Sequence, residues 1–350
     1  MTTREKTKRI IVGGVAVGGG APVSVQSMCC TKTQDVEATL RQISSLAAAG
    51  CEIVRLAVPD MDAARAISAI KERSPLPIVA DIHFDYKLAV EAARRGADKI
   101  RINPGNIGGP EKVAAVAREC SLHNIPIRIG VNGGSLEKSL LEKYGHPTPE
   151  ALVESAFSHI RMLEDVGFGD ICVSMKSSNV PLMMQAYRLM HERSDYPLHV
   201  GVTETGTEYM GTIKSAMGIG GLLCLGIGDT IRVSLTADPV REVVAAKAIL
   251  KAAGLRKQGV NLISCPTCGR TKIDLIGLAN RVQEALQDCD KELTVAVMGC
   301  VVNGPGEARE ADIGIAGGDG CGVLFVHGEL KEKLPYDELL PALLRYIDAM

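Results

Sequence analysis

Four arginines interrupt apolar runs of the kind that form buried β-strands. They are Arg55 in IVRLAV, Arg101 in KIRIN, Arg128 in PIRIGVN and Arg232 in TIRVSL. A guanidinium between isoleucine and valine side chains cannot stay hydrated, so it needs an anion or a carboxylate partner. A carboxylate such as Asp81 explains any one of them equally well, but the candidate strands offer too few carboxylates for four. Guanidinium groups match phosphate oxygens in pairs, so the set predicts a polyanionic small substrate, a diphosphate above all.

Further polar residues close the same apolar runs and add hydrogen-bonding and acid–base groups. They are Asp81, His83, Asn103, Asn132, Lys176, Glu204 and Ser234. Asp81 and His83 are two positions apart, which places both on one face of a strand. Glu204 would serve as a proton donor if apolar surroundings raise its pKa, and a salt bridge to a neighbouring arginine is the alternative.

Cysteines near the C-terminal end have the spacing of metal ligands. Cys265 and Cys268 form C-P-T-C, and Cys300 opens the segment CVVNGPGE. Three thiolates fit an iron–sulfur cluster or a zinc ion, and the spacing alone leaves both open. Zinc requires a fourth ligand, for which Cys289, Cys321 and His327 are the candidates. The turn NGPG would instead return Glu307 to Cys300, and a carboxylate at one iron gives a labile position where a substrate can bind.

Composition excludes several other classes of protein. The chain has 350 residues, a formal charge of −2, 3% aromatic residues and no Trp. Neither a nucleic acid nor an anionic membrane is therefore expected as a partner. No apolar run of about 18 residues predicts a membrane span, and the charged N-terminus lacks the apolar core of a signal peptide. Eleven cysteines without a secretory signal favour metal binding or buried thiols over disulfides, so a cytoplasmic location is expected.

Strand-like and helix-like segments alternate through the first 252 residues. Candidate strands cover 23–28, 52–58, 77–83, 98–103, 126–132, 170–176, 198–204 and 229–235, and helical patterns include 35–49, 60–73, 85–95, 149–166, 179–193 and 238–252. Eight such units predict an α/β fold, a closed (β/α)₈ barrel of the TIM type, with an open doubly wound sheet as the competitor. The absence of G-x-G-x-x-G at the first strand–helix junction disfavours a nucleotide-binding version of that sheet. A short hairpin within 10–22 would close the barrel floor.

A second, smaller domain is expected over 253–350. Its predicted elements are a cysteine-bearing strand and turn at 261–268, a helix at 274–288, strands at 293–298, 312–316 and 322–327, and a helix at 336–348. A unit of this size gains stability from a bound metal. The sequence thus predicts a barrel with a substrate site, over 1–252, followed by a small α+β metal domain.

Several motifs together carry a family resemblance. ADIHFDY, RINPGNIGG, IPIRIGVNGGSLEK, GIGDTIRVSL and CPTC with GCVVNGPGE resemble the bacterial 4-hydroxy-3-methylbut-2-enyl diphosphate synthases, from about residue 8 to residue 320. The resemblance implies reductive ring opening and dehydration of 2-C-methyl-D-erythritol 2,4-cyclodiphosphate in the non-mevalonate isoprenoid pathway. It implies electrons from reduced flavodoxin or ferredoxin, delivered singly through a 4Fe–4S cluster.

The resemblance also implies roles for individual residues. Cys265, Cys268, Cys300 and Glu307 match the cluster ligands. Arg55, Arg101, Asn103, Arg128, Asn132, Lys176, Arg232 and Ser234 match positions that hold the cyclic diphosphate, while Asp81, His83 and Glu204 match polar groups around its reacting carbons.

Quaternary structure follows from chain direction. The helix at 238–252 returns the chain to the floor of the barrel, so the second domain starts far from the catalytic rim. A head-to-tail homodimer, in which each cluster domain caps the partner's barrel, is therefore expected, and the resemblance implies the same. A monomer with a hinge is the alternative. Two rival functions remain open on the residues alone: a zinc-binding scaffold protein and a barrel aldolase with a Schiff base on Lys176.

Overall fold

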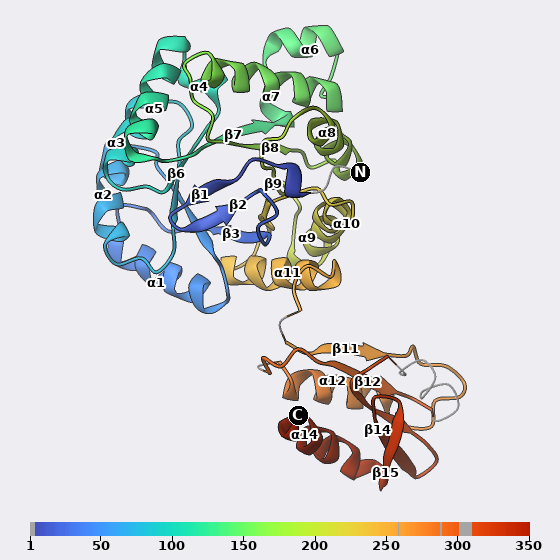
Figure 1. The fold of residues 1–350 in the computed structure, drawn as a ribbon. Helices are drawn as coiled ribbons and strands as arrows, with labels where there is room; N and C mark the ends of the chain where they lie inside the picture. The colour runs from blue at the N-terminus through green and yellow to red at the C-terminus, as the bar shows by residue number, and fades with distance from the viewer. Residues whose placement is uncertain (1–3, 258, 288, 301–309) are drawn as a thin grey trace. The chain divides into compact units, whose positions relative to one another are not determined.

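The computed structural model describes residues 4–257, 259–287, 289–300 and 310–350. These residues form two compact units, Met1–Leu255 and Arg256–Met350, each with its own hydrophobic core (Figure 1). Glu307 lies outside the described residues. No helix in the described part of the chain is long and apolar enough to cross a membrane.

The first unit is a parallel barrel whose strands follow one another in chain order. The strands are β3 (Ser24–Met28), β4 (Ile53–Ala57), β5 (Ile78–Asp81), β6 (Lys99–Ile102), β7 (Ile127–Asn132), β8 (Ile171–Lys176), β9 (His199–Val200) and β10 (Thr230–Ile231). Each strand pairs in parallel with the next through β8, β9 pairs with β10, and β10 pairs with β3. A parallel bridge between Val173 and Leu198 joins β8 to the segment before β9 and closes the ring. The predicted (β/α)₈ barrel is confirmed, and the open sheet is excluded.

Helices surround this ring. They are α1 (Val36–Ala48), α2 (Met61–Lys71), α3 (Tyr86–Arg94), α4 (Pro104–Ile107), α5 (Pro110–His123), α6 (Lys138–Tyr144), α7 (Pro149–Glu164), α8 (Val180–Arg193), α9 (Glu208–Ser215), α10 (Gly221–Cys224) and α11 (Pro239–Ala252), with a π-helical turn, Ala216–Gly220, joining α9 to α10. Many begin where a short polar side chain accepts a hydrogen bond from the first turn, as Asp60 does from Ala63 N and Thr148 from Ala151 N. These caps fix where the capped helices begin, at the end of the barrel where the strands finish.

The two faces of the barrel strands differ in chemistry. Alternate residues such as Val54, Leu56, Ile100 and Ile102 point outward into the core shared with the helices. At the barrel floor, the hairpin β1 (Ile10–Val12) and β2 (Val15–Val17) packs against a small apolar cluster that contains Ile53, Val79 and Cys172. Above that floor the interior is lined by polar side chains.

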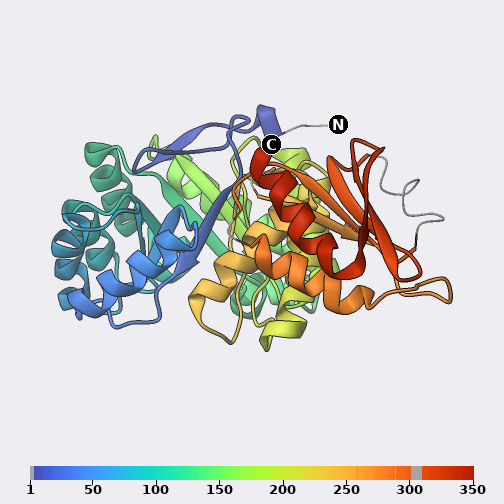
Figure 2. The same cartoon turned by 90° about the horizontal axis from the view of Figure 1, so that it is seen from below.

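In its described residues, the second unit has a five-stranded sheet with two helices on one face (Figure 2). Its strands are β11 (Asn261–Ser264), β12 (Thr294–Met298), β13 (Ile313–Gly317), β14 (Cys321–Val326) and β15 (Glu329–Pro335), and its helices are α12 (Leu275–Ala285) and α14 (Leu339–Ala349). The first three strands are parallel and the last two antiparallel. The sequence pattern did not predict β15, because ELKEKLP has the charged composition of an exposed edge strand.

Candidate functional site

Two glycines make room for the cationic side chains inside the barrel. A Cβ atom at Gly130 on β7 would lie 2.5 Å from Arg101 Nε, and one at Gly201 would lie 3.2 Å from Lys176 Nζ and 2.7 Å from the Arg232 carbonyl. Both positions face inward, so any side chain there would displace a cation or the backbone. The sequence thus leaves space in the barrel that a branched residue normally fills.

The inward side chains surround a cavity of about 130 Å³ at the carboxyl ends of the strands. It is lined by Arg55, Asp81, His83, Arg101, Arg128, Asn132, Ser174, Lys176, Thr203, Arg232 and Ser234. This end of a (β/α)₈ barrel is where catalytic groups from different strands meet. Six of the eight barrel strands, or the residues that directly follow them, contribute a charged side chain to the cavity.

Asp81 pairs with two of the arginines. Its Oδ1 lies 3.1 Å from Arg101 Nη1, and its Oδ2 lies 3.7 Å from Arg55 Nε. His83 Nε2 lies 3.4 Å from Oδ2. Burial alone would raise the pKa of Asp81, but the positive charges of Arg55 and Arg101 and the contact with His83 outweigh it and hold that pKa below its usual range. Asp81 is therefore an ionised anchor for the cations and not a proton donor at neutral pH.

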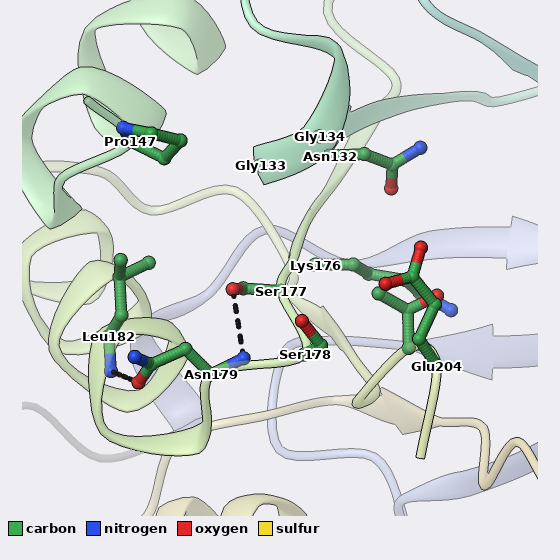
Figure 3. Close-up of a pocket in the computed structure, with 11 residues that line it drawn as sticks. Asn132, Gly133, Gly134, Pro147, Lys176, Ser177, Ser178, Asn179, Leu182 and Glu204 are labelled. Carbon is green, nitrogen blue, oxygen red and sulfur yellow. Dashed lines mark hydrogen bonds between the residues drawn. The ribbon is translucent and has the colours of Figure 1, made fainter. Parts of the chain in front are cut away.

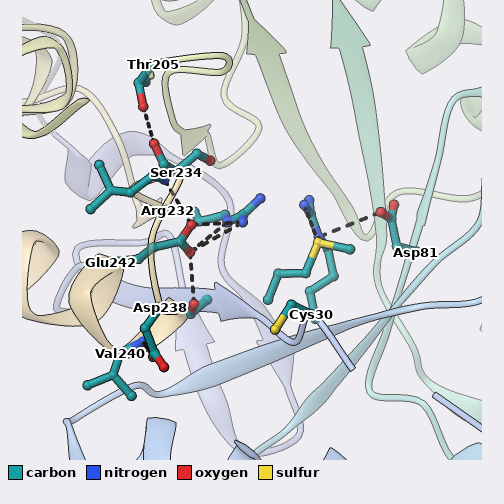
Figure 4. Close-up of polar contacts among 12 residues, drawn as sticks. Cys30, Asp81, Thr205, Arg232, Ser234, Asp238, Val240 and Glu242 are labelled. Atoms are coloured by element: carbon teal, nitrogen blue, oxygen red, sulfur yellow. Dashed lines mark hydrogen bonds and ion pairs between the residues drawn. The ribbon is translucent and has the colours of Figure 1, made fainter. Parts of the chain in front are cut away.

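Arg232 has a carboxylate partner that does not come from a strand. Glu242, in the first turn of α11, lies 3.2 Å from Arg232 Nη2 and also accepts hydrogen bonds from Ser27 Oγ and Leu235 N (Figure 4). A carboxylate from this helix thus supplements the few that the strand ends offer to the four arginines. The signal was present in the sequence, since a glutamate in the first turn of a helix lies at the same rim as the end of the preceding strand.

Arg128 and Lys176 have no ion-pair partner within the described residues. Arg128 is 1% exposed and Lys176 is 7% exposed. Burial lowers the pKa of Lys176 well below its ordinary value, and the charges of Arg55, Arg232, Arg128 and Arg101 lower it further. Two buried cations without a counter-ion make this cavity a strong binding site for an anion.

A wider pocket of about 570 Å³ adjoins the cationic cavity and shares Asn132, Lys176 and Thr203 with it. Asn132, Lys176 and Glu204 gather on one side of this pocket, while Pro147 and Leu182 lie on the other (Figure 3). Glu204 is exposed and adopts φ of 53°, in the left-handed region that residues other than glycine rarely occupy. Strained backbone of this kind is concentrated at functional sites.

Most of the barrel residues predicted from the sequence meet in one place. The cavity contains Arg55, Asp81, His83, Arg101, Arg128, Asn132, Lys176, Arg232 and Ser234, and Glu204 lies in the adjoining pocket. Asn103 is buried directly after β6, but it lines neither of these two pockets. Ser174 and Thr203 were missed. Ser174 lies two positions before Lys176 on the same face of β8, and this spacing could have identified it, whereas Thr203 directly precedes the predicted Glu204.

The cysteines of the second unit gather at one end of its sheet. Strands β11 and β12 are parallel neighbours with Ser264 opposite Val297, so Cys265 and Cys300 both follow the carboxyl ends of adjacent strands. The Gly299 amide donates a hydrogen bond to Cys265 Sγ over 3.2 Å. Hydrogen bonds from the backbone and side chain of Arg270 lower the pKa of the exposed Cys268 thiol.

These features suit thiolate ligands of an iron–sulfur cluster. Backbone N–H donors stabilise negative charge on sulfur, and a lowered pKa favours the thiolate form that binds metal. Within the described ranges, no three Cys, His, Asp or Glu side chains already lie together at metal-binding positions. The fourth predicted ligand, Glu307, lies outside those ranges, so the complete ligand set belongs to the proposal below.

A barrel with a polyanion site, joined to a unit whose cysteines suit an iron–sulfur centre, defines an oxidoreductase of phosphorylated substrates. Two family models match the chain: the GcpE TIM-barrel domain over residues 7–247 and the GcpE protein C-terminal domain over residues 261–349. The chain belongs to the GcpE family, and the predicted family, enzyme class and barrel are confirmed.

Curated relatives match this chain along almost its whole length. A protein of Geobacter sulfurreducens is 60% identical over 99% of this chain and 98% of its own length, and one of Clostridium perfringens is 58% identical over 99% of each. Both are named 4-hydroxy-3-methylbut-2-en-1-yl diphosphate synthase (flavodoxin). Among solved structures, two dihydropteroate synthases resemble this chain in the barrel fold alone. That of Stenotrophomonas maltophilia has a TM-score of 0.53 and 13% identity, and the match covers 71% of this chain and 98% of that one. That of Yersinia pestis has a TM-score of 0.51 and 16% identity, and the match covers 71% of this chain and 99% of that one.

Proposed function

We propose that this chain converts 2-C-methyl-D-erythritol 2,4-cyclodiphosphate into 4-hydroxy-3-methylbut-2-enyl diphosphate, in the non-mevalonate isoprenoid pathway. The bond between a ring carbon and a phosphate oxygen breaks, and a hydroxyl group leaves as water. With the substrate written as the dianion and the product as the trianion, the reaction takes up two electrons and one proton. The observation that carries the proposal is the cationic cavity, in a chain whose close relatives bear the name of this enzyme.

The barrel residues bind and orient the cyclic diphosphate. Arg128 and Lys176 offer the positive charge that no described carboxylate neutralises, so they attract the two phosphate groups most strongly. Arg55 and Arg101 are held in place by Asp81, and Arg232 by Glu242. Asn132, Ser174, Thr203 and Ser234 add neutral hydrogen-bonding groups around the same cavity. When the substrate binds, its phosphate oxygens thus take the place of the water that the cations lose through burial.

Proton delivery is assigned by elimination among the three predicted acid–base groups. Asp81 is ionised, since its pKa is held below the usual range by the neighbouring cations. His83 lies at the cavity rim with 57% of its side chain exposed, and Glu204 lies in the adjoining pocket. We assign the protonation of the departing hydroxyl to Glu204, because it is exposed and has no ion-pair partner among the described residues, whereas His83 contacts Asp81.

The second unit supplies the redox centre. A 4Fe–4S cluster held by Cys265, Cys268, Cys300 and Glu307 would accept single electrons from reduced flavodoxin or ferredoxin and pass them to the substrate. The name of the relatives specifies flavodoxin, which favours that donor for this chain. The chain's own contribution is to present two thiols at the ends of adjacent strands and a third, Cys268, on the loop that follows β11.

Chain direction supports a head-to-tail homodimer. The helix α11 has 14 residues and returns the chain by about 21 Å from the cavity end of the barrel to its floor. Eight residues, 253–260, separate the end of α11 from β11. They span at most about 28 Å when fully extended, too little to lead the cysteines comfortably around the barrel wall to the cavity of the same chain. A two-fold dimer solves this problem, because each cluster unit then completes the partner's site.

An activity assay with defined components tests the proposal. Anaerobically purified protein, loaded with iron and sulfide, is given the cyclic diphosphate and chemically reduced flavodoxin, and the product is identified by mass spectrometry. We expect 4-hydroxy-3-methylbut-2-enyl diphosphate, and at a low concentration of the cyclic diphosphate we expect far less of it from an Arg128→Ala variant with the same iron content. Turnover that does not depend on iron, or a product that retains the ring, would refute the assignment.

A further inference from the structure

The lower part of the barrel interior, between the cavity and the β1–β2 hairpin, carries polar side chains that the proposed reaction does not use. We call Ser24, Gln26, Lys99, His199 and Thr230, together with Arg128, the lower polar layer. All six residues are inward-facing by strand alternation, since Val25, Ile100, Ile127, Val200 and Ile231 on the opposite faces belong to the outer core. None is more than 1% exposed. The layer is therefore shielded from bulk solvent.

Many polar atoms of this layer have no hydrogen-bond partner within the described residues. They are Lys99 Nζ, Arg128 Nε and Nη1, both ring nitrogens of His199, both amide atoms of Gln26, Thr230 Oγ1 and Ser24 Oγ. In folded proteins almost all buried polar atoms are hydrogen-bonded, to protein, water or an ion. So many orphaned atoms in one layer indicate a bound species that is not part of the polypeptide.

Strand register places the two cations of the layer close together. Arg101 is paired with Arg128 across β6 and β7, and Lys99 lies two residues below Arg101 on the same face of β6. Lys99 and Arg128 are thus diagonal neighbours on adjacent strands, a separation that long side chains bridge easily. Ser24, Thr230 and His199 form a second group, since they are register partners across β3, β10 and β9.

The balance of donors and charges favours an anion over water alone. Lys99 and Arg128 are only donors, and no described carboxylate pairs with either. Six basic side chains face the barrel interior, namely Arg55, Lys99, Arg101, Arg128, Lys176 and Arg232, against the two carboxylates Asp81 and Glu242. A cyclic diphosphate with two negative charges and these two carboxylates balance the four arginines but not the lysines. Uncompensated buried charge is costly, so the charged form of Lys99 favours a further anion beside it.

We propose that the lower polar layer binds one small monovalent inorganic anion, chloride, between Lys99 and Arg128. The count of charges rests on the proposed substrate, whereas the finding that these buried donors have no partner does not depend on it. Without such an anion, burial and the charges of Arg128 and Arg55 lower the pKa of Lys99 to about 8, despite an opposing contribution from Cys172. His199 is neutral, because burial and the same cations hold its pKa well below the ordinary value, and it offers one further N–H.

The site has a consequence for the substrate cavity, because Arg128 belongs to both. Its Nε and Nη1 have no hydrogen-bond partner within the described residues, and the residue also lines the cavity. An anion bound to one of these nitrogen atoms would fix the orientation of the whole guanidinium group toward the diphosphate. Lys99 then acts as a positioning residue through the anion, without touching the substrate.

Bromide substitution tests the proposal on the unaltered protein. Crystals of the full cluster-loaded chain are grown with the cyclic diphosphate in sodium bromide, and anomalous scattering locates the bromide ions. We expect one peak in contact with both Lys99 Nζ and Arg128 Nε or Nη1, beneath the diphosphate. Water alone in the layer, or a bromide only in the upper cavity, would overturn the proposal. If the cyclic diphosphate does not enter the upper cavity, the proposed function fails, while the lower peak still decides the anion site.

A variant supplies a second readout. At constant ionic strength, replacing gluconate by chloride should raise the melting temperature of the wild-type chain, because a ligand that binds only the folded state stabilises it. Gluconate is too large for a buried site of this kind. Lys99→Met should abolish the chloride dependence, whereas Lys214→Met, which removes a charge from α9 on the outer wall, should retain it. An equal chloride effect in all three proteins would contradict the assignment, and if Lys99→Met does not fold, the bromide experiment decides.

Discussion

Arg101 Nη1 lies 3.1 Å from Asp81 Oδ1, and both side chains are buried inside the barrel. Asp81 therefore organises the cationic cavity, since it also pairs with Arg55 through its other oxygen at 3.7 Å. One carboxylate between two guanidinium groups leaves a net positive charge while keeping both arginines in fixed positions. This relationship determines the first of the predictions that follow.

Asp81→Asn should destabilise the barrel by on the order of 3–5 kcal/mol, because it leaves two buried guanidinium groups without a charge partner. The free energy of unfolding, measured by denaturant titration of cluster-free protein, checks this. The contribution of Asp81 is fully present above its unfolded-state pKa of about 3.9 and is lost as the pH falls further, since its folded-state pKa is lower. The difference between wild type and variant should thus shrink below about pH 4. An equal difference at neutral and acid pH would contradict the ion-pair role.

Arg128→Ala should weaken binding of the cyclic diphosphate by about ten- to a hundredfold, the loss of a charge-assisted pair of hydrogen bonds worth about 1.5–3 kcal/mol. Arg128→Lys should recover only part of this, because an ammonium cannot form the planar fork. Calorimetry on cluster-loaded protein gives both dissociation constants. Unchanged affinity in Arg128→Ala would remove this residue from the binding site.

Glu242→Gln should strengthen binding of the same ligand severalfold. Glu242 neutralises Arg232 at 3.2 Å, and the amide removes this negative charge. Its one oxygen remains an acceptor for Leu235 N, while its nitrogen can donate to Ser27 Oγ, whose hydroxyl can also accept. Arg232→Ala should have the opposite effect, since it leaves a buried carboxylate beside the phosphate groups. If both variants bind the cyclic diphosphate as wild type does, Arg232 is a structural residue only.

Cys265→Ser, Cys268→Ser and Cys300→Ser should each abolish cluster retention and turnover while the barrel stays folded. Iron content, visible absorption and circular dichroism report the two effects separately. Cys289→Ser and Cys321→Ser are matched controls in the same unit and should retain iron. Glu307→Ala should keep most of the iron, because three thiolates remain, but lose turnover. Full activity in Glu307→Ala would refute its ligand role.

Mixing two inactive variants tests the dimer. Cys265→Ser lacks a cluster and Arg128→Ala has a weakened barrel site, so neither turns over when the cyclic diphosphate is kept far below the dissociation constant of Arg128→Ala. A head-to-tail heterodimer contains one intact composite site and should regain activity after refolding or coexpression. If each chain used its own cluster, every site in the mixture would carry a lesion and no ratio would restore turnover. Two copies of the same variant, mixed in the same way, give the background.

The order of elements and the chemistry of the site were determined by the sequence itself. An arginine between β-branched residues has few stable environments, so Arg55, Arg101, Arg128 and Arg232 already predicted a polyanion site at strand ends. The alternation of strands and helices predicted the barrel, because hydrophobic periodicity is a property of short stretches of sequence and can be recognised without the tertiary structure. The spacing of Cys265 and Cys268 likewise indicated a metal centre, although it left zinc and iron–sulfur open.

Only the tertiary structure decided how the charges are shared. Glu242 reaches Arg232 from a helix, Asp81 serves two arginines, and Asn103 lies outside both pockets, and none of these facts follows from strand patterns. The tertiary structure also revealed Lys99 as a buried cation without a partner among the described residues, although in the sequence it looks like an ordinary lysine at the start of a strand. The physical reason is that burial and ion pairing depend on distances between strands remote in sequence, whereas periodicity reports only which face of its own strand a residue occupies.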